Sequence, residues 1–153
     1  MKLGDVLKKE REKKGASVEE AAEALHISKE DYETMEAGES EAETIGPLLA
    51  QIAINLETPT ARLLAESGRA EDTKQGECGK LIQGHRERRE KSVDEMAEAL
   101  EISKEEYQKV EAGESGIEVF GPRLLYFAEL IEQPVFNLFY PCGLPFQELD
   151  DYP

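Results

Sequence analysis

The amino-acid sequence predicts an all-α protein made of two tandem five-helix units joined by a short linker. Three observations lead to this fold class. A long segment recurs at a constant spacing of 75 residues, its apolar residues stand three and four positions apart, and serine, glycine and proline mark the ends of the helical stretches. Because the repeat has no gap, we expect both copies to fold alike and each to close its own hydrophobic core.

The repeat sets the domain boundaries. The segment from Ser17 reads SVEEAAEALHISKEDYETMEAGES, and the segment from Ser92 reads SVDEMAEALEISKEEYQKVEAGES. The stretch between the copies is polar and contains glycine, as flexible linkers do. We assign residues 1–66 to copy one, 67–77 to the linker, 78–140 to copy two and 141–153 to a tail rich in proline and aromatic residues. The tail either folds back over copy two or presents an apolar patch to a partner.

The first helix of each copy is expected over residues 3–14 and 78–90. The second begins after a capping box, in which a serine and the glutamate three residues later satisfy each other's backbone amides. These boxes are Ser17 with Glu20 and Ser92 with Glu95. Apolar residues at helical spacing predict the buried face of this helix: Val18, Ala21, Ala22 and Leu25, and Val93, Met96, Ala97 and Leu100.

The third helix of each copy is short, with Ser28 or Ser103 as its N-cap and Gly38 or Gly113 after its end. Its inward residues are expected to be Tyr32 and Met35, and Tyr107 and Val110. Proline suits the first turn of a helix. We therefore expect the fourth helix to begin near Pro47 or Pro122 and the fifth at Pro59 or Pro134.

This pattern resembles the Cro and lambda-repressor type of helix-turn-helix domain, the XRE family, over nearly the whole chain, counted twice. The features that carry the resemblance are an Ala-x-x-Leu spacing in the second helix, a tight turn and a closing Glu-x-Gly. They are Ala22 to Leu25, Ile27-Ser28 and Glu36-Ala37-Gly38 in copy one, and Ala97 to Leu100, Ile102-Ser103 and Glu111-Ala112-Gly113 in copy two. The resemblance implies structural pairs between Arg11 and Glu36 and between Arg86 and Glu111.

The resemblance also implies that the third helix enters the major groove of DNA, flanked by phosphate contacts. Carried over by position, the candidate DNA-binding residues are Lys29, Thr34, Lys104, Gln108 and Lys109. Arg88 and Arg89 lie in a basic segment that either contacts phosphates, docks an acidic partner or forms a solvated helix face. The sequence departs from the family where a DNA-contacting glutamine is typical, because Val18 and Val93 stand there. Neither third helix carries an arginine.

The charge pattern is unusual for a DNA-binding protein. The chain has a net charge of −16, whereas nucleic-acid binders usually carry a basic surface. Residues 1–16 and 78–91 carry +3 each, and residues 17–77 and 92–153 carry −11 each. The basic first helices are therefore followed by strongly acidic segments, which oppose the approach of a phosphate backbone.

Two functions follow from these observations. The first is a transcriptional regulator with tandem DNA-binding domains, ranked slightly ahead because the resemblance covers both copies. The alternative is an acidic protein-interaction module that keeps the fold, has lost direct DNA binding and engages a basic protein partner, in a form that imitates nucleic acid. Both functions are compatible with a homodimer.

Other classes of function have little support in the sequence. No nucleophile, metal or cofactor motif is visible, so we expect no enzyme and no cofactor. Cys78 and Cys142 lack the spacing of a zinc site, and we expect two free thiols, with a disulfide between them as the alternative. No apolar run is long enough for a membrane span and the amino terminus lacks a signal-peptide pattern, so we expect a cytoplasmic protein.

Overall fold

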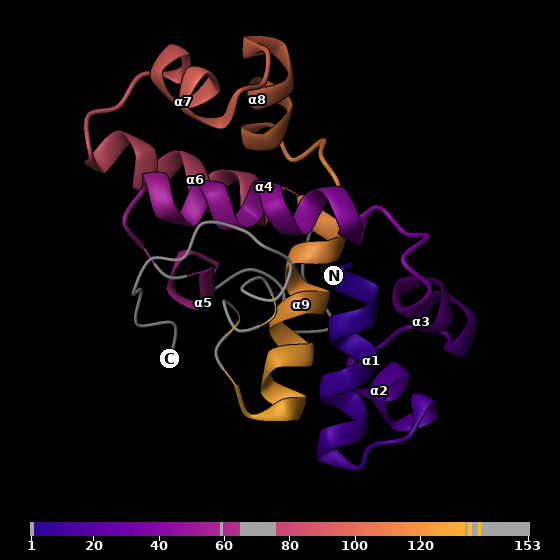
Figure 1. Cartoon of the computed structure of the whole chain (residues 1–153). Coiled ribbons are helices and arrows are strands. Elements are labelled where there is room, and N and C mark those ends of the chain that lie inside the picture. Colours follow the sequence, from indigo (N-terminus) through magenta and orange to yellow (C-terminus); the bar gives the residue numbers. More distant parts are fainter. Residues whose placement is uncertain (1, 59, 65–75, 134, 136–137, 139–153) are drawn as a thin grey trace.

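The computed structural model of the chain describes residues 2–58, 60–64, 76–133, 135 and 138. All regular structure in these residues is helical, which confirms the all-α class. The helices, in chain order, are α1 (Leu3–Lys14), α2 (Val18–Ala24), α3 (Lys29–Glu36), α4 (Ala42–Asn55), α5 (Thr60–Leu63), α6 (Glu77–Arg88), α7 (Val93–Leu100), α8 (Lys104–Glu111) and α9 (Ile117–Ile131). Figure 1 shows their arrangement.

The predicted serine caps set the starts of the short helices. The amide of Glu20 donates to Ser17 Oγ at 3.0 Å, and the amide of Ser17 donates to Glu20 Oε1 at 3.0 Å. The same box opens α7, while Ser28 and Ser103 cap α3 and α8. Each cap satisfies an amide that has no partner inside its helix. These local predictions are confirmed.

The fourth helix of each copy starts earlier than predicted. α4 begins at Ala42 and α9 at Ile117, so Pro47 and Pro122 lie inside the helices and not at their starts. Serine side chains supply the starting signal, because Ser40 Oγ accepts from the amide of Ala42 and Ser115 Oγ from that of Ile117, each at 3.2 Å. Each proline removes one backbone hydrogen bond from its helix.

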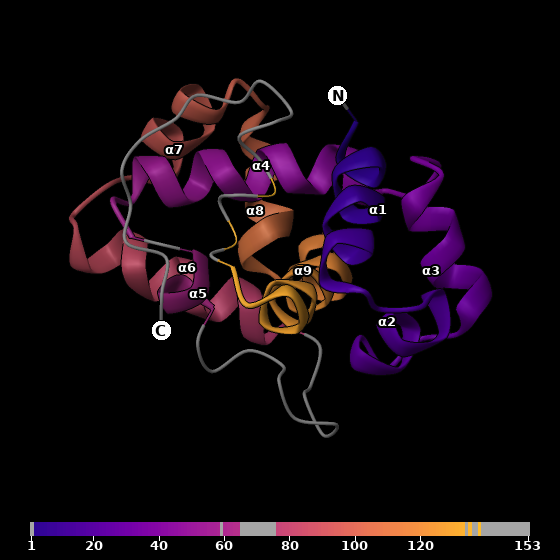
Figure 2. The ribbon, with the colours of Figure 1, turned by 60° about the horizontal axis from the view of Figure 1, so that its bottom comes forward.

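The long helices α4 and α9 each extend from their own half of the chain onto the opposite half, an arrangement that we call the helix exchange. α9 belongs to copy two in sequence and packs on α6 of that copy, but it also packs on α1 and α2 of copy one. The ring of His26 meets the ring of Tyr126 edge-on at 5.1 Å between centroids, and Tyr32 stacks on Phe127 at 6.4 Å. Figures 1 and 2 both show α9 beside α1.

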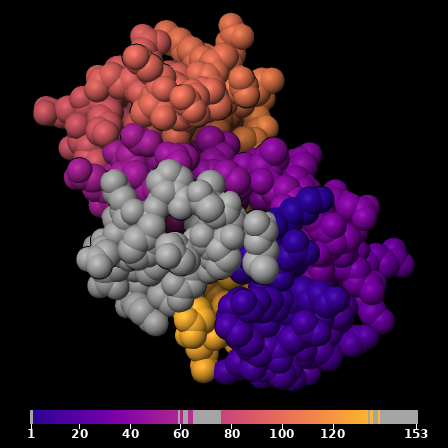
Figure 3. Space-filling model, viewed as in Figure 1, coloured from indigo at the N-terminus to yellow at the C-terminus, as the bar shows by residue number. Residues whose placement is uncertain are grey.

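The reciprocal exchange places α4 of copy one against α7 of copy two. Two contacts hold its carboxyl end there. Arg89 Nη2 donates to Thr58 Oγ1 at 2.6 Å, and Lys91 Nζ donates to the carbonyl of Asn55 at 2.7 Å. In Figure 3, the purple band that contains α4 lies directly against the orange helices of copy two.

One hydrophobic core results from this exchange. Buried residues of both halves form a single cluster, and α4 packs on α9 where the two helices cross. A Cβ atom on Gly116, just before α9, would lie 3.0 Å from the side chain of Ile45 in α4. The expectation of two separate cores is therefore wrong, because α4 and α9 carry their apolar faces into the opposite half.

The finer predictions on domain boundaries stay predictions. α5 is a single turn, and most of its counterpart in copy two lies outside the described residues, as do the tail at 141–153, Cys142 and nearly all of the linker. Cys78 is buried at the start of α6. Glu77, assigned to the linker, is the first residue of α6.

Candidate nucleic-acid interface

Two equivalent surfaces carry most of the candidate residues. We call the exposed residues of α2 and α3 the first face, and those of α7 and α8 the second face. Tyr32 and Met35 anchor α3, and both are fully buried. Tyr107 and Val110 anchor α8 in the same way. Apart from the last glutamate of each helix, the remaining positions of α3 and α8, which include all the predicted groove-facing ones, are exposed to solvent.

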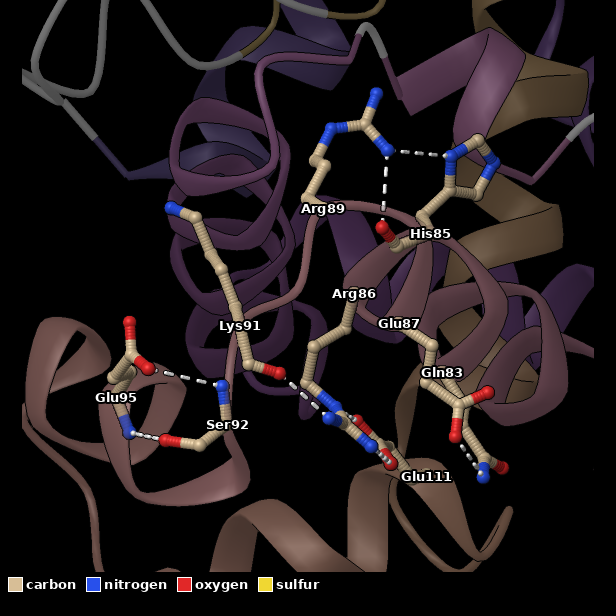
Figure 4. A network of polar contacts seen from close by, with 9 residues as sticks. All are labelled: Gln83, His85, Arg86, Glu87, Arg89, Lys91, Ser92, Glu95 and Glu111. Atoms are coloured by element: carbon tan, nitrogen blue, oxygen red, sulfur yellow. Dashed lines mark hydrogen bonds and ion pairs between the residues drawn. The ribbon is translucent and has the colours of Figure 1, made fainter.

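An ion pair ties each third helix to its first helix. Arg11 Nε lies 2.6 Å from Glu36 Oε2, Arg11 Nη2 donates to Glu36 Oε1 at 3.1 Å, and Arg11 Nη1 donates to the carbonyl of Ala16 at 2.9 Å. Figure 4 shows the equivalent pair of Arg86 and Glu111. The hydrogen bond to Glu36 raises the pKa of Arg11 above its ordinary value. The four residues act as the scaffold of the two faces.

A glycine lets each first helix approach its third helix closely. A Cβ atom on Gly4 would lie 2.5 Å from the carbonyl oxygen of Met35, and one on Gly79 would lie 2.5 Å from those of Val110 and Glu111. Real Cβ atoms do not come so close to backbone oxygens, so both positions require glycine. This contact fixes the distance between the faces and the basic first helices.

A buried tyrosine hydroxyl lies beside each ion pair. The Oη atoms of Tyr32 and Tyr107 have no hydrogen-bond partner in the described part of the chain. Burial is the main reason why the pKa of each tyrosine is raised above its ordinary value. The hydroxyls therefore stay neutral and contribute nothing to the charge of the faces.

The lysine at the start of each third helix is already paired with an acid of the preceding helix. Lys29 Nζ lies 2.8 Å from Glu19 Oε1, and Lys104 Nζ lies 3.5 Å from Asp94 Oδ1. The hydrogen bond between them raises the pKa of Lys29 and lowers that of Glu19. Such exposed pairs contribute little to stability. They do neutralise the one cation of α3 and one of the two on α8.

The other candidates on these helices are exposed. Thr34 Oγ1 donates to the carbonyl of Glu30 at 2.9 Å, so its hydroxyl is partly used within α3. Gln108 and Lys109 project from α8, and Lys109 forms no ion pair with any described residue. The first face therefore presents mainly carboxylates, whereas the second face keeps one unpaired cation.

Arg88 and Arg89 differ from each other. Arg88 is exposed at the end of α6. Arg89 donates to the carbonyl of His85 at 3.0 Å and to Thr58 across the exchange contact, so it serves as a structural residue. In Figure 4, Arg89 and His85 point away from the side of α6 on which Glu111 lies. The structure does not bring Arg89 to the second face.

Sequence reasoning missed two glutamates that hold the first helices. Glu43 accepts hydrogen bonds from the amides of Leu3 and Gly4 at 3.0 and 2.9 Å. Its repeat partner Glu118 accepts from the amide of Gly79 at 2.9 Å. Each carboxylate occupies the positive end of a helix, where an anion is favoured. The sequence does contain one signal for this role, because both glutamates occupy the same position of the repeat.

Comparisons with known proteins add no assignment. No family model, curated protein sequence or solved structure matches the chain. Within the described residues, no three histidine, cysteine, aspartate or glutamate side chains group as metal ligands. None of the described helices combines the length and the apolar character that a membrane crossing requires. The function is therefore inferred from the two faces alone.

Proposed function

We propose that the chain consists of two helix-turn-helix units of the Cro and lambda-repressor type that bind a basic protein partner through their acidic faces. The fold proposal is supported by the caps, by the Arg–Glu pairs and by the packing of α2 on α3 and of α7 on α8. The family resemblance alone ranks DNA regulation slightly ahead. The charges on the two faces favour a basic protein partner over DNA.

One observation carries the proposal: the pairing of Lys29 with Glu19 and of Lys104 with Asp94 at the position that would approach a phosphate backbone. DNA affinity depends on cations that neutralise phosphates. On the first face, Lys29 is the only cation among the residues of α2 and α3, and it is paired while Glu30 and Glu33 are exposed. A basic surface complements such a face, and a phosphate backbone does not.

The test uses two probes at low ionic strength, a lysine-rich peptide and a mixed-sequence DNA duplex. We expect the peptide to bind, with an affinity that falls with salt, and the duplex not to bind. Glu33→Gln on the first face is expected to weaken peptide binding more than Glu12→Gln, which removes the same charge from an exposed position of α1. Equal effects of the two substitutions, or binding of the duplex, would contradict the proposal.

A second candidate function is DNA binding by the second face. The specific observation is that Lys109 is exposed without an ion pair to any described residue and lies next to Gln108 on α8. For this function, Lys104→Glu and Lys109→Glu would each reduce binding of the duplex at low salt. Thr34→Glu, at the position of copy one that matches Lys109, is the control and would have a smaller effect.

A further inference from the structure

Each candidate face rests on a helix that comes from the other half of the sequence. The first face is supported by α9, where Phe127 stacks on Tyr32 of α3 and Tyr126 meets His26 after α2. Phe127 is fully buried. Arg123 of α9 also lies close enough to Asp31 of α3 for their charges to interact. The ordered conformation of α2 and α3 therefore depends on contacts with α9 of copy two.

The other end of α9 is fixed in copy two. Glu118, in its first turn, accepts from the amides of Gly76 and Gly79 at 2.7 and 2.9 Å, and so holds the start of α6. α6 in turn packs on α8. α9 thus connects the first face to α6, on which α8 of the second face packs.

α4 makes the reciprocal connection. Glu43, in its first turn, holds the start of α1 through the amides of Leu3 and Gly4. Its far end bonds to Arg89 and Lys91, the residues that lead into α7. Each face is consequently braced by a helix whose start is fixed in the opposite half.

We propose that α4 and α9 couple the two faces, so that a partner bound on one face changes how well ordered the helices of the other face are. Coupling requires a physical element that both sites influence, and a rigid helix packed against one face and anchored beneath the other is such an element. The identity of the bound partner rests on the proposed function. The transmission through α4 and α9 is a property of the chain itself.

Hydrogen exchange of the free full-length chain tests the transmission. Phe127→Leu is expected to speed the exchange of amides in residues 18–36 about tenfold, because it removes a packing contact of α3. The control Val119→Ala, on an exposed position of the same helix, is expected to leave these amides unchanged. Ile52→Val, at the repeat-equivalent buried position of α4, is expected to speed exchange over residues 93–111 by a few fold.

The outcome for residues 18–36 decides the proposal. Exchange that in Phe127→Leu becomes faster in residues 18–36 than in the other helices supports it. Exchange that is unchanged there, or that rises equally in every helix, overturns it. If Phe127→Leu does not fold, Tyr126→Ala gives the same measurement at a half-buried position. A peptide that fails to bind would contradict the proposed function, whereas the exchange rates of the free chain would still decide the coupling.

Discussion

Two tyrosine hydroxyls in the interior of the protein lower the stability of the folded state in a way that the sequence does not reveal. Tyr32 and Tyr107 are fully buried beside the Arg–Glu pairs, and their hydroxyls find no hydrogen-bond partner among the described residues. A buried polar group without a partner is unfavourable. Burial also raises the pKa of both tyrosines in the folded chain.

The raised pKa values predict a loss of stability at high pH. The folded state holds the phenol protons more tightly than the unfolded state, where the tyrosine pKa is about 10. The resulting stabilisation is complete below pH of about 10 and is lost as the pH rises above it. We expect the double variant Tyr32→Phe and Tyr107→Phe to lose less free energy of unfolding between pH of about 9 and 11 than the natural chain does.

Denaturant unfolding at several pH values measures this effect. At pH 7 the free energy of unfolding of the double variant should equal or exceed that of the natural chain, because the substitutions remove two buried hydroxyls that have no hydrogen-bond partner among the described residues. The same alkaline loss in both proteins would show that these hydroxyls are not the buried groups responsible.

Whether a helix contact can be predicted from the sequence depends on whether the interacting residues are close together or far apart in the chain. The serine caps of the short helices follow the sequence, since the cap and the amide it binds are three residues apart. The exchange of α4 and α9 could not be predicted, because the repeat gives both halves nearly the same packing surfaces and an apolar helix fits either one. Left-handed conformations at Glu57, Glu101 and Glu132 were also missed, since glutamate rarely adopts them.

The two glycines of α6 give a prediction at the level of this helix. Gly79→Ala should destabilise the protein by about 2 kcal/mol or more, because its Cβ would collide with backbone oxygens of α8. Gly84→Ala should stabilise it by about 0.5 to 1 kcal/mol, because its nearest neighbour is a terminal nitrogen of Arg88 at 3.6 Å and alanine favours a helix.

Thermal unfolding followed by circular dichroism separates the two variants. The midpoint should fall for Gly79→Ala and rise for Gly84→Ala. A shift of both midpoints in the same direction would contradict the close contact between α6 and α8.

For the whole molecule, the single core predicts that both halves unfold together. α4 and α9 each complete the opposite half, so neither half keeps its packing when the other unfolds. We expect one calorimetric transition, with a calorimetric enthalpy equal to the van't Hoff enthalpy. Two transitions, or an enthalpy ratio well above one, would indicate halves that fold independently.

The most direct test of the helix exchange is a nuclear Overhauser experiment on the aromatic rings of the dilute full-length chain. The helix exchange predicts cross-peaks between Tyr32 and Phe127 and between His26 and Tyr126, and a mixture of labelled and unlabelled chains should show that they arise within one molecule. Cross-peaks that instead join Phe127 to Tyr107 of its own half would contradict the exchange and the coupling built on it.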